Sequence, residues 1–149
     1  MKKRILSLFA LILFSFGIAV ASEGWITDYP LALKTAKEQN KQVLLLFTGS
    51  DWCPPCMYME RNVFSSEQFT KLADKEFVRV MLDFPRNKQQ SASLEADNEA
   101  LAQKFSIKGF PTVIVVDASG KEIARHVGSC SLTKLIEWLT GTLAKAAVK

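Results

Sequence analysis

The segment Trp52-Cys53-Pro54-Pro55-Cys56 constrains the fold of this chain more than any other feature. It follows a continuous apolar run at 43–47, which is typical of a strand covered on both faces. The polar and glycine residues at 48–51 break that run, and Pro54 suits the first turn of a helix. The sequence therefore predicts two cysteines at a junction where a strand ends and a helix begins.

Cysteines with this spacing at a helix N-terminus can close a small disulfide. The unpaired N–H groups and the positive end of the helix dipole favour the thiolate form of Cys53. This arrangement suits thiol–disulfide exchange, in which Cys53 attacks a substrate disulfide. Cys56, which we expect the helix to bury more deeply, then resolves the mixed disulfide.

The apolar pattern of the remaining chain predicts one α/β domain. Its order is a βαβ unit, a linking helix, a β-hairpin and a closing helix, which gives a mixed sheet with helices on both faces. Residues 22–29 are interpreted as a lead-in without regular structure. Strands are expected at 43–47, 77–82, 112–116 and 123–127, and helices at 30–40, from 54, after Ser65 or Ser66, at 94–105 and at 132–143.

Residues 1–21 have the features of a secretory signal peptide. Three basic residues at 2–4 precede an apolar run at 5–20, which closes with the small-x-small sequence Ala19-Val20-Ala21. We expect cleavage after that sequence, which leaves a single domain at 22–149. A retained membrane anchor is the alternative, but the run is short for a membrane span and is diluted by serine and glycine.

The charge of the mature chain argues against nucleic-acid binding. The full chain carries 19 Lys and Arg against 15 Asp and Glu, and residues 1–21 hold three of the basic residues and none of the acidic ones. The mature formal charge is therefore close to zero, and no basic stripe with interleaved aromatic residues remains. After export the cysteines work outside the cytosol, where a dithiol is oxidised unless a partner keeps it reduced.

Taken together, these motifs resemble the thioredoxin superfamily. The resemblance covers about residues 25–143, and the run at 46–53 is similar to exported bacterial thioredoxin-like reductases of the DsbH type. It implies the thioredoxin fold, a cis peptide bond before Pro111, and a substrate groove shaped by Trp52, Phe110, Pro111 and Gly128. The residues that carry it are Trp52-Cys53-Pro54-Pro55-Cys56, Asp83 at a strand end, Gly109-Phe110-Pro111-Thr112, and Gly128 before the last helix.

By that resemblance the chain is a periplasmic protein-disulfide reductase. Its substrates would be disulfide-containing exported proteins, and a membrane electron donor or another reduced partner would recharge it. The Cys53–Cys56 dithiol serves in place of a cofactor, and we expect a monomer without a metal. Strong oxidases of this superfamily need a very stable thiolate, whereas Pro54 and Pro55 have no N–H to give the Cys53 sulfur, which favours reduction over oxidation.

The chain departs from thioredoxins at the position of their buried aspartate, which lies six residues before the nucleophile. That position is Phe47 here. Arg79 falls where thioredoxins often have a lysine near that aspartate, and we interpret it as a strand residue that reaches solvent. The sequence leaves the proton acceptor for Cys56 unassigned, with water as one candidate.

Three other interpretations stay open. Cys53 and Cys56 could bind zinc with His126 and Cys130, although prolines cannot supply the N–H groups that support zinc-bound sulfur. The pair could also be a permanent staple in an exported binding module, although so short a loop adds little stability. A disulfide oxidase or isomerase of the same fold is the third. Cys130 itself is interpreted as an unreactive, partly buried thiol, and residues 86–88 as a small solvated cluster.

Overall fold

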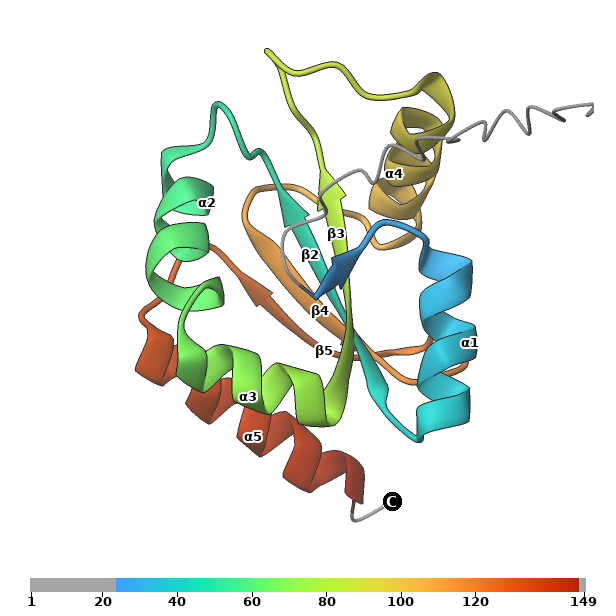
Figure 1. Cartoon of the computed structure of the whole chain (residues 1–149), viewed down its shortest axis with the longest axis vertical. Coiled ribbons are helices and arrows are strands. Elements are labelled where there is room, and N and C mark those ends of the chain that lie inside the picture. The colour runs from blue at the N-terminus through green and yellow to red at the C-terminus, as the bar shows by residue number, and fades with distance from the viewer. Residues whose placement is uncertain (1–23, 148–149) are drawn as a thin grey trace, which may run out of the picture.

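The computed structural model describes residues 24–147, and the predicted signal peptide at 1–21 lies outside them. The central sheet has five strands in the order β1-β3-β2-β4-β5 (Figure 1). β1, β3 and β2 run parallel, whereas β4 and β5 are antiparallel to their neighbours, which confirms the predicted mixed sheet. The strands are β1 (Trp25–Ile26), β2 (Gln42–Thr48), β3 (Phe77–Asp83), β4 (Thr112–Val116) and β5 (Glu122–Val127).

Helices cover both faces of the sheet. One face packs against α1 (Tyr29–Gln39) and α4 (Ala92–Lys104). The other face packs against α2 (Pro54–Met59), the π-helical turn η1 (Glu60–Phe64), α3 (Glu67–Glu76) and α5 (Leu132–Ala147). In the part of the chain described, none of these helices combines the length and hydrophobicity that a membrane crossing needs.

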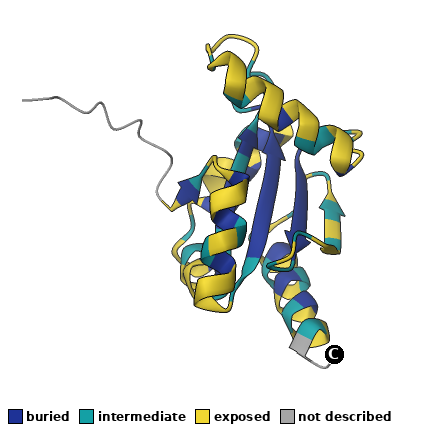
Figure 2. Ribbon diagram, turned by 90° about the vertical axis from the view of Figure 1, so that its right-hand side faces the viewer, coloured by how far each residue is buried: buried dark blue, intermediate teal, exposed yellow. Residues whose placement is uncertain are grey.

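β2 is the centre of the core, and its side chains alternate between the two faces. Leu44 and Leu46 point towards α2, α3 and α5, whereas Val43, Leu45 and Phe47 point towards α1 and α4. All five are at most 2% exposed, and Figure 2 shows the central strands as buried. A strand covered on both faces is therefore the correct interpretation of the continuous apolar run.

The structure differs from the sequence-based expectation at several element boundaries. The expected lead-in contains β1, whose two residues pair with Arg79 and Val80 of β3. A strand this short has no alternating pattern to detect. α4 begins at Ala92, two residues before the predicted start, because the Ser91 side chain accepts a hydrogen bond from a first-turn N–H and caps it.

Candidate redox site

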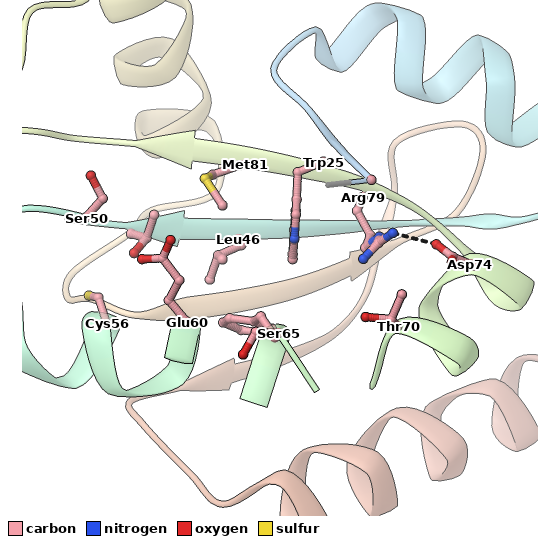
Figure 3. Close-up of a pocket in the computed structure, with 13 residues that line it drawn as sticks. Trp25, Leu46, Ser50, Cys56, Glu60, Ser65, Thr70, Asp74, Arg79 and Met81 are labelled. Carbon is pink, nitrogen blue, oxygen red and sulfur yellow. Dashed lines mark hydrogen bonds and ion pairs between the residues drawn. The ribbon is translucent and has the colours of Figure 1, made fainter. Parts of the chain in front are cut away.

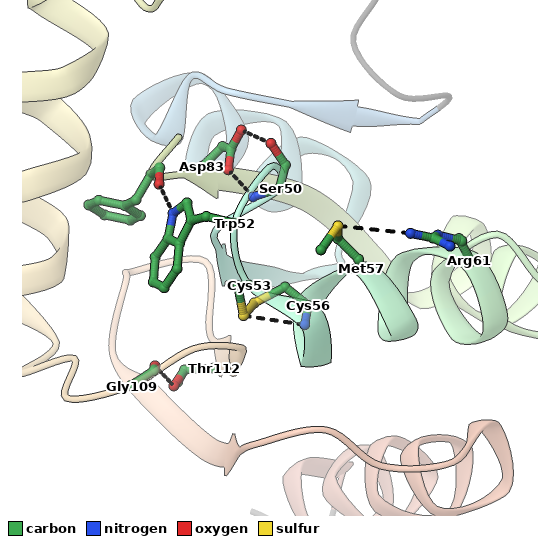
Figure 4. Close-up of a disulfide and its surroundings, with 10 residues drawn as sticks. Ser50, Trp52, Cys53, Cys56, Met57, Arg61, Asp83, Gly109 and Thr112 are labelled. Carbon is green, nitrogen blue, oxygen red and sulfur yellow. Dashed lines mark hydrogen bonds between the residues drawn. A yellow bond between two sulfur atoms is a disulfide. The ribbon is translucent and has the colours of Figure 1, made fainter. Parts of the chain in front are cut away.

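The two cysteines of the motif are joined by a disulfide at the start of α2 (Figure 4). Cys53 is the N-cap residue, and Pro54 and Pro55 fill the first two helical positions. The backbone N–H of Cys56 donates to the Sγ atom of Cys53 at 3.3 Å. Because prolines have no N–H, this is the one first-turn backbone donor that remains for the Cys53 sulfur.

Burial does not distinguish the two cysteines. Cys53 is 4% exposed and Cys56 is 2% exposed, so the expected contrast in depth is small. Their neighbours differ instead. Cys53 follows Trp52 at the end of the sheet, whereas Cys56 lines a cavity behind the disulfide.

Trp52 is held in place on several sides. Its Nε1 atom donates to the carbonyl oxygen of Phe84 at 2.7 Å, and its ring meets the ring of Phe110 edge to face at 5.8 Å between centroids. A Cβ atom at Gly49 would lie 2.5 Å from the indole, so only glycine fits beneath it. The guanidinium of Arg86 lies over the ring, 3.8 Å from its centroid.

The segment at 109–112 lies at the same end of the sheet as the disulfide (Figure 4). The peptide bond between Phe110 and Pro111 is cis, as predicted. The Pro111 carbonyl accepts a hydrogen bond from the N–H of Gly128 at 2.8 Å. Thr112 pairs with Phe47 at the end of β2 from which the disulfide loop leaves. Trp52 thus contacts Phe110, and Gly128 bonds to Pro111, at the end of the sheet where the disulfide loop leaves β2.

The loop before the disulfide is fastened to the loop after β3 by Asp51. Its carboxylate accepts hydrogen bonds from the backbone N–H groups of Arg86, Asn87 and Lys88, at 2.9, 2.7 and 3.0 Å. These bonds, led by that from Arg86, hold the pKa of Asp51 below its ordinary value. Sequence reasoning missed this contact, because 35 or more residues separate its partners.

Replacing Asp51 with alanine is expected to release the 86–88 loop. Amide hydrogen exchange at those three residues should accelerate about tenfold, since each N–H loses a charged acceptor. In the wild-type protein the same release should occur as pH falls through the lowered pKa of Asp51, because a depressed carboxyl pKa stabilises only above that range. Asp28→Ala, which removes the N-cap of α1, is the control and should leave exchange at 86–88 unchanged. Equal amide exchange rates at 86–88 in Asp51→Ala and in the wild type would show that Asp51 does not hold this loop.

A cavity of about 470 Å³ lies behind the disulfide. Figure 3 shows Cys56 and Glu60 on one side of it, Arg79 and Asp74 on the far side, and Trp25 between them. The remaining lining residues are mostly small or polar. They are Gly24, Leu46, Thr48, Ser50, Phe64, Ser65, Thr70 and Met81.

The lining of the cavity shows that Phe47 does not lie on the Cys56 side of β2, where a proton-accepting aspartate would be needed. The β2 side chains on the Cys56 side are Leu46 and Thr48, whereas Phe47 packs on the opposite face against Phe84 and Phe105. Phe47 therefore does not occupy the place of an aspartate beneath the resolving cysteine. A count of six residues does not by itself give the face, because side chains alternate along the strand and a shift of one position reverses it.

The interpretation of Arg79 as solvent-reaching is wrong. Its side chain is 4% exposed, forms an ion pair with Asp74 and lies 5.7 Å from the ring centroid of Trp25. β1 causes this burial, because it pairs with β3 at Arg79 and covers it. Gly24 has φ +83°, and a Cβ atom there would lie 1.8 Å from the guanidinium, so only glycine fits.

The residues of the zinc alternative do not gather at one point. The two motif sulfurs are bonded to each other, and His126 packs against the ring of Trp138 at 5.7 Å between centroids. Within residues 24–147, no group of three or more His, Cys, Asp or Glu side chains is placed to hold a metal ion. Cys130 is partly buried as expected, and this burial raises the pKa of its thiol.

Comparison with known proteins agrees with this geometry. Residues 29–142 match the model of the thioredoxin-like domain. The chain is 35% identical over 108 residues to "Disulfide bond reductase DsbH" of Chlamydia pneumoniae, which covers 72% of this chain and 64% of that protein. It is 35% identical over 105 residues to "Thioredoxin-related protein DsbJ" of the same organism, covering 70% of this chain and 30% of DsbJ. The chain thus spans less than two thirds of either relative.

The solved structures include one that matches almost end to end. A "DsbH Oxidoreductase" structure superposes with a TM-score of 0.74 and 28% identity, covering 96% of this chain and 95% of that one. The domain match, the relatives and the five-stranded sheet with its Cys-X-X-Cys disulfide agree. The chain belongs to the thioredoxin-like family.

Proposed function

We propose that the mature chain is a periplasmic thiol–disulfide oxidoreductase that reduces disulfides in exported proteins. The observation that carries the proposal is the Cys53–Cys56 disulfide at the N-terminus of α2, beside the cis-proline segment. The relative named as a disulfide bond reductase supports the direction of electron flow.

In the first step the reduced protein acts through Cys53. Its thiolate attacks one sulfur of the substrate disulfide, so that a new S–S bond forms and the other substrate sulfur leaves as a thiolate, which takes up a proton. An extended substrate segment would pair with the backbone of Phe110, in the segment beside the disulfide loop. Trp52, Phe110 and Gly128 shape the groove around that segment.

In the second step Cys56 resolves the mixed disulfide. Its thiol loses a proton, and the resulting thiolate attacks the Sγ atom of Cys53, which releases the second substrate sulfur as a thiolate. Two electrons pass from the dithiol to the substrate, and the Cys53–Cys56 disulfide is left behind. β2 supplies no carboxylate beneath Cys56, so we assign the proton to Glu60, whose side chain shares the cavity with Cys56 (Figure 3).

The donors around Cys53 support the proposed direction of the reaction. A strongly oxidising pair needs a thiolate stabilised by several N–H groups, whereas Pro54 and Pro55 leave only that of Cys56. The reduced form is therefore less favoured than in an oxidase, and the pair gives its electrons to a substrate readily.

The proposed location and partners rest on the predicted signal peptide. With residues 1–21 removed in export, the protein cannot take electrons directly from the cytosol. A membrane electron donor, or another reduced partner outside the cytosol, would regenerate the dithiol of a monomeric enzyme.

Two matched assays on the mature chain test the proposal. The reduced chain should reduce a model protein disulfide catalytically when a chemical dithiol regenerates it. The oxidised chain should oxidise a reduced, unfolded protein much more slowly. Faster oxidation than reduction would make the protein an oxidase. No turnover in either direction would favour a permanent structural disulfide in a binding module.

Replacing Glu60 with glutamine is expected to slow the second step by roughly 100-fold near neutral pH, because Cys56 loses its proton acceptor. The rate should recover as pH rises, since solvent then deprotonates the thiol directly. Rapid mixing and acid quenching would measure the lifetime of the mixed disulfide. The control is Glu67→Gln, at an exposed carboxylate on α3. An unchanged lifetime of the mixed disulfide in Glu60→Gln would show that Glu60 is not the proton acceptor for Cys56.

A further inference from the structure

Arg86 places a cationic group over Trp52, the residue that precedes Cys53. It lies in the exposed loop after β3, and its guanidinium lies over the ring of Trp52, the residue before Cys53. Trp52 in turn contacts Phe110 of the cis-proline segment. The charge therefore borders Trp52 and the cis-proline segment, which we propose line the substrate groove.

The loop that carries Arg86 is held in a fixed position. Asp51 accepts hydrogen bonds from three successive backbone N–H groups, beginning at Arg86. The Nζ atom of Lys88 donates to the Oγ atom of Ser50 at 3.3 Å, and Trp52 donates to the Phe84 carbonyl at the start of the loop. A charge held in this way is pre-organised, and binding a partner costs less ordering.

Two carboxylates on the loops around Arg86 already have donors within the chain. Asp51 is occupied by the loop, and Asp83 accepts from the N–H and the hydroxyl of Ser50 at 2.9 and 2.6 Å. Among residues 24–147, the guanidinium of Arg86 has no carboxylate partner. Lys88 is less available, since it borders a small cavity that Glu95 and Glu99 also line. Arg86 is therefore an exposed cation beside Trp52 that a bound substrate would meet.

We infer that Arg86 is a specificity residue that selects substrates with an acidic side chain close to their disulfide. The inference rests on the proposed function and names its substrate class. A guanidinium stacked on an indole keeps its N–H donors at the ring edge, where a planar carboxylate can accept two of them. Residues 86–88 are thus more than the solvated cluster expected from the sequence.

The test uses two synthetic peptides with the same disulfide, flanked by glutamate in one and by glutamine in the other. At low salt the wild-type chain should reduce the glutamate peptide about threefold to tenfold faster, as judged by the second-order rate constant. The ratio should fall close to one in Arg86→Gln and should also fall as salt is added. Arg86→Lys keeps the charge without the planar fork and should give an intermediate ratio.

The control is Lys71→Gln, at an exposed lysine of α3 that pairs with Glu67, and it should keep the wild-type ratio. If the wild type reduces both peptides at equal rates, or if Arg86→Gln keeps the preference, the inference is wrong and the proposed function stands. If the wild type reduces neither peptide, the proposed function fails and the inference fails with it.

Discussion

The Cys53→Ser variant should lose disulfide reduction, by a factor of about 1,000 or more, because it lacks the sulfur that forms the mixed disulfide. The serine hydroxyl is a poor nucleophile towards a disulfide at neutral pH. Cys56 is then a thiol within the first turn of α2, facing the cavity behind the site. The measurement is the initial rate of reduction of a model protein disulfide.

The Cys56→Ser variant should fail in a different way. Cys53 still attacks, but no neighbouring thiol displaces the substrate, so the variant accumulates as a mixed disulfide. Non-reducing electrophoresis followed by mass spectrometry would show this species and, in the native compartment, would identify the substrates. Cys130→Ser is the control and should retain activity, because its partly buried thiol has a raised pKa. Reduction by Cys53→Ser with Cys130 intact would overturn the choice of nucleophile.

Truncation of Phe47 to alanine should be the most destabilising of the single changes considered. Its ring is fully buried and packs against those of Phe84 and Phe105, with centroids 6.5 and 6.2 Å away. Removing it leaves a cavity in the core between β2 and α4, at a cost of about 3–5 kcal/mol in the free energy of unfolding. The midpoint of urea denaturation would measure the loss.

A matched control for this prediction is Leu31→Ala on α1, where the side chain is 48% exposed. Its cost should stay within about 0.5 kcal/mol. Because Phe47 faces away from the cavity behind Cys56, the folded Phe47→Ala protein should keep the reactivity of the cysteine pair. A small stability loss together with altered cysteine reactivity would place Phe47 on the other face of the sheet and contradict the structure.

The main architecture follows from local patterns in the sequence. The apolar runs at 43–47 and 112–116 are long enough to identify central strands, and serine and proline residues mark several helix starts. The position of Cys53 as a helix N-cap follows from the break before it and the prolines after it. The cis bond before Pro111 required the family resemblance, because an isolated X–Pro bond is usually trans.

The errors arise where a local pattern carries no information about the neighbouring elements. A continuous apolar strand does not reveal which face each side chain takes, so counting back from Cys53 could not show that Phe47 lies on the face away from Cys56. The burial of Arg79 depends on β1, a strand too short to be recognised. The Asp51 contacts depend on how two loops fold onto each other, and no spacing in the sequence encodes this.

The most direct test of the reductase assignment is the equilibrium reduction potential of the Cys53–Cys56 pair in the mature chain. The pair would be equilibrated with dithiothreitol or glutathione buffers and its redox state quantified by thiol alkylation. A potential near that of thioredoxin, about −270 mV, is the predicted result. A potential near −120 mV would show a disulfide that oxidises folding proteins, and the absence of a reversible couple would show a structural staple; either result would contradict the account.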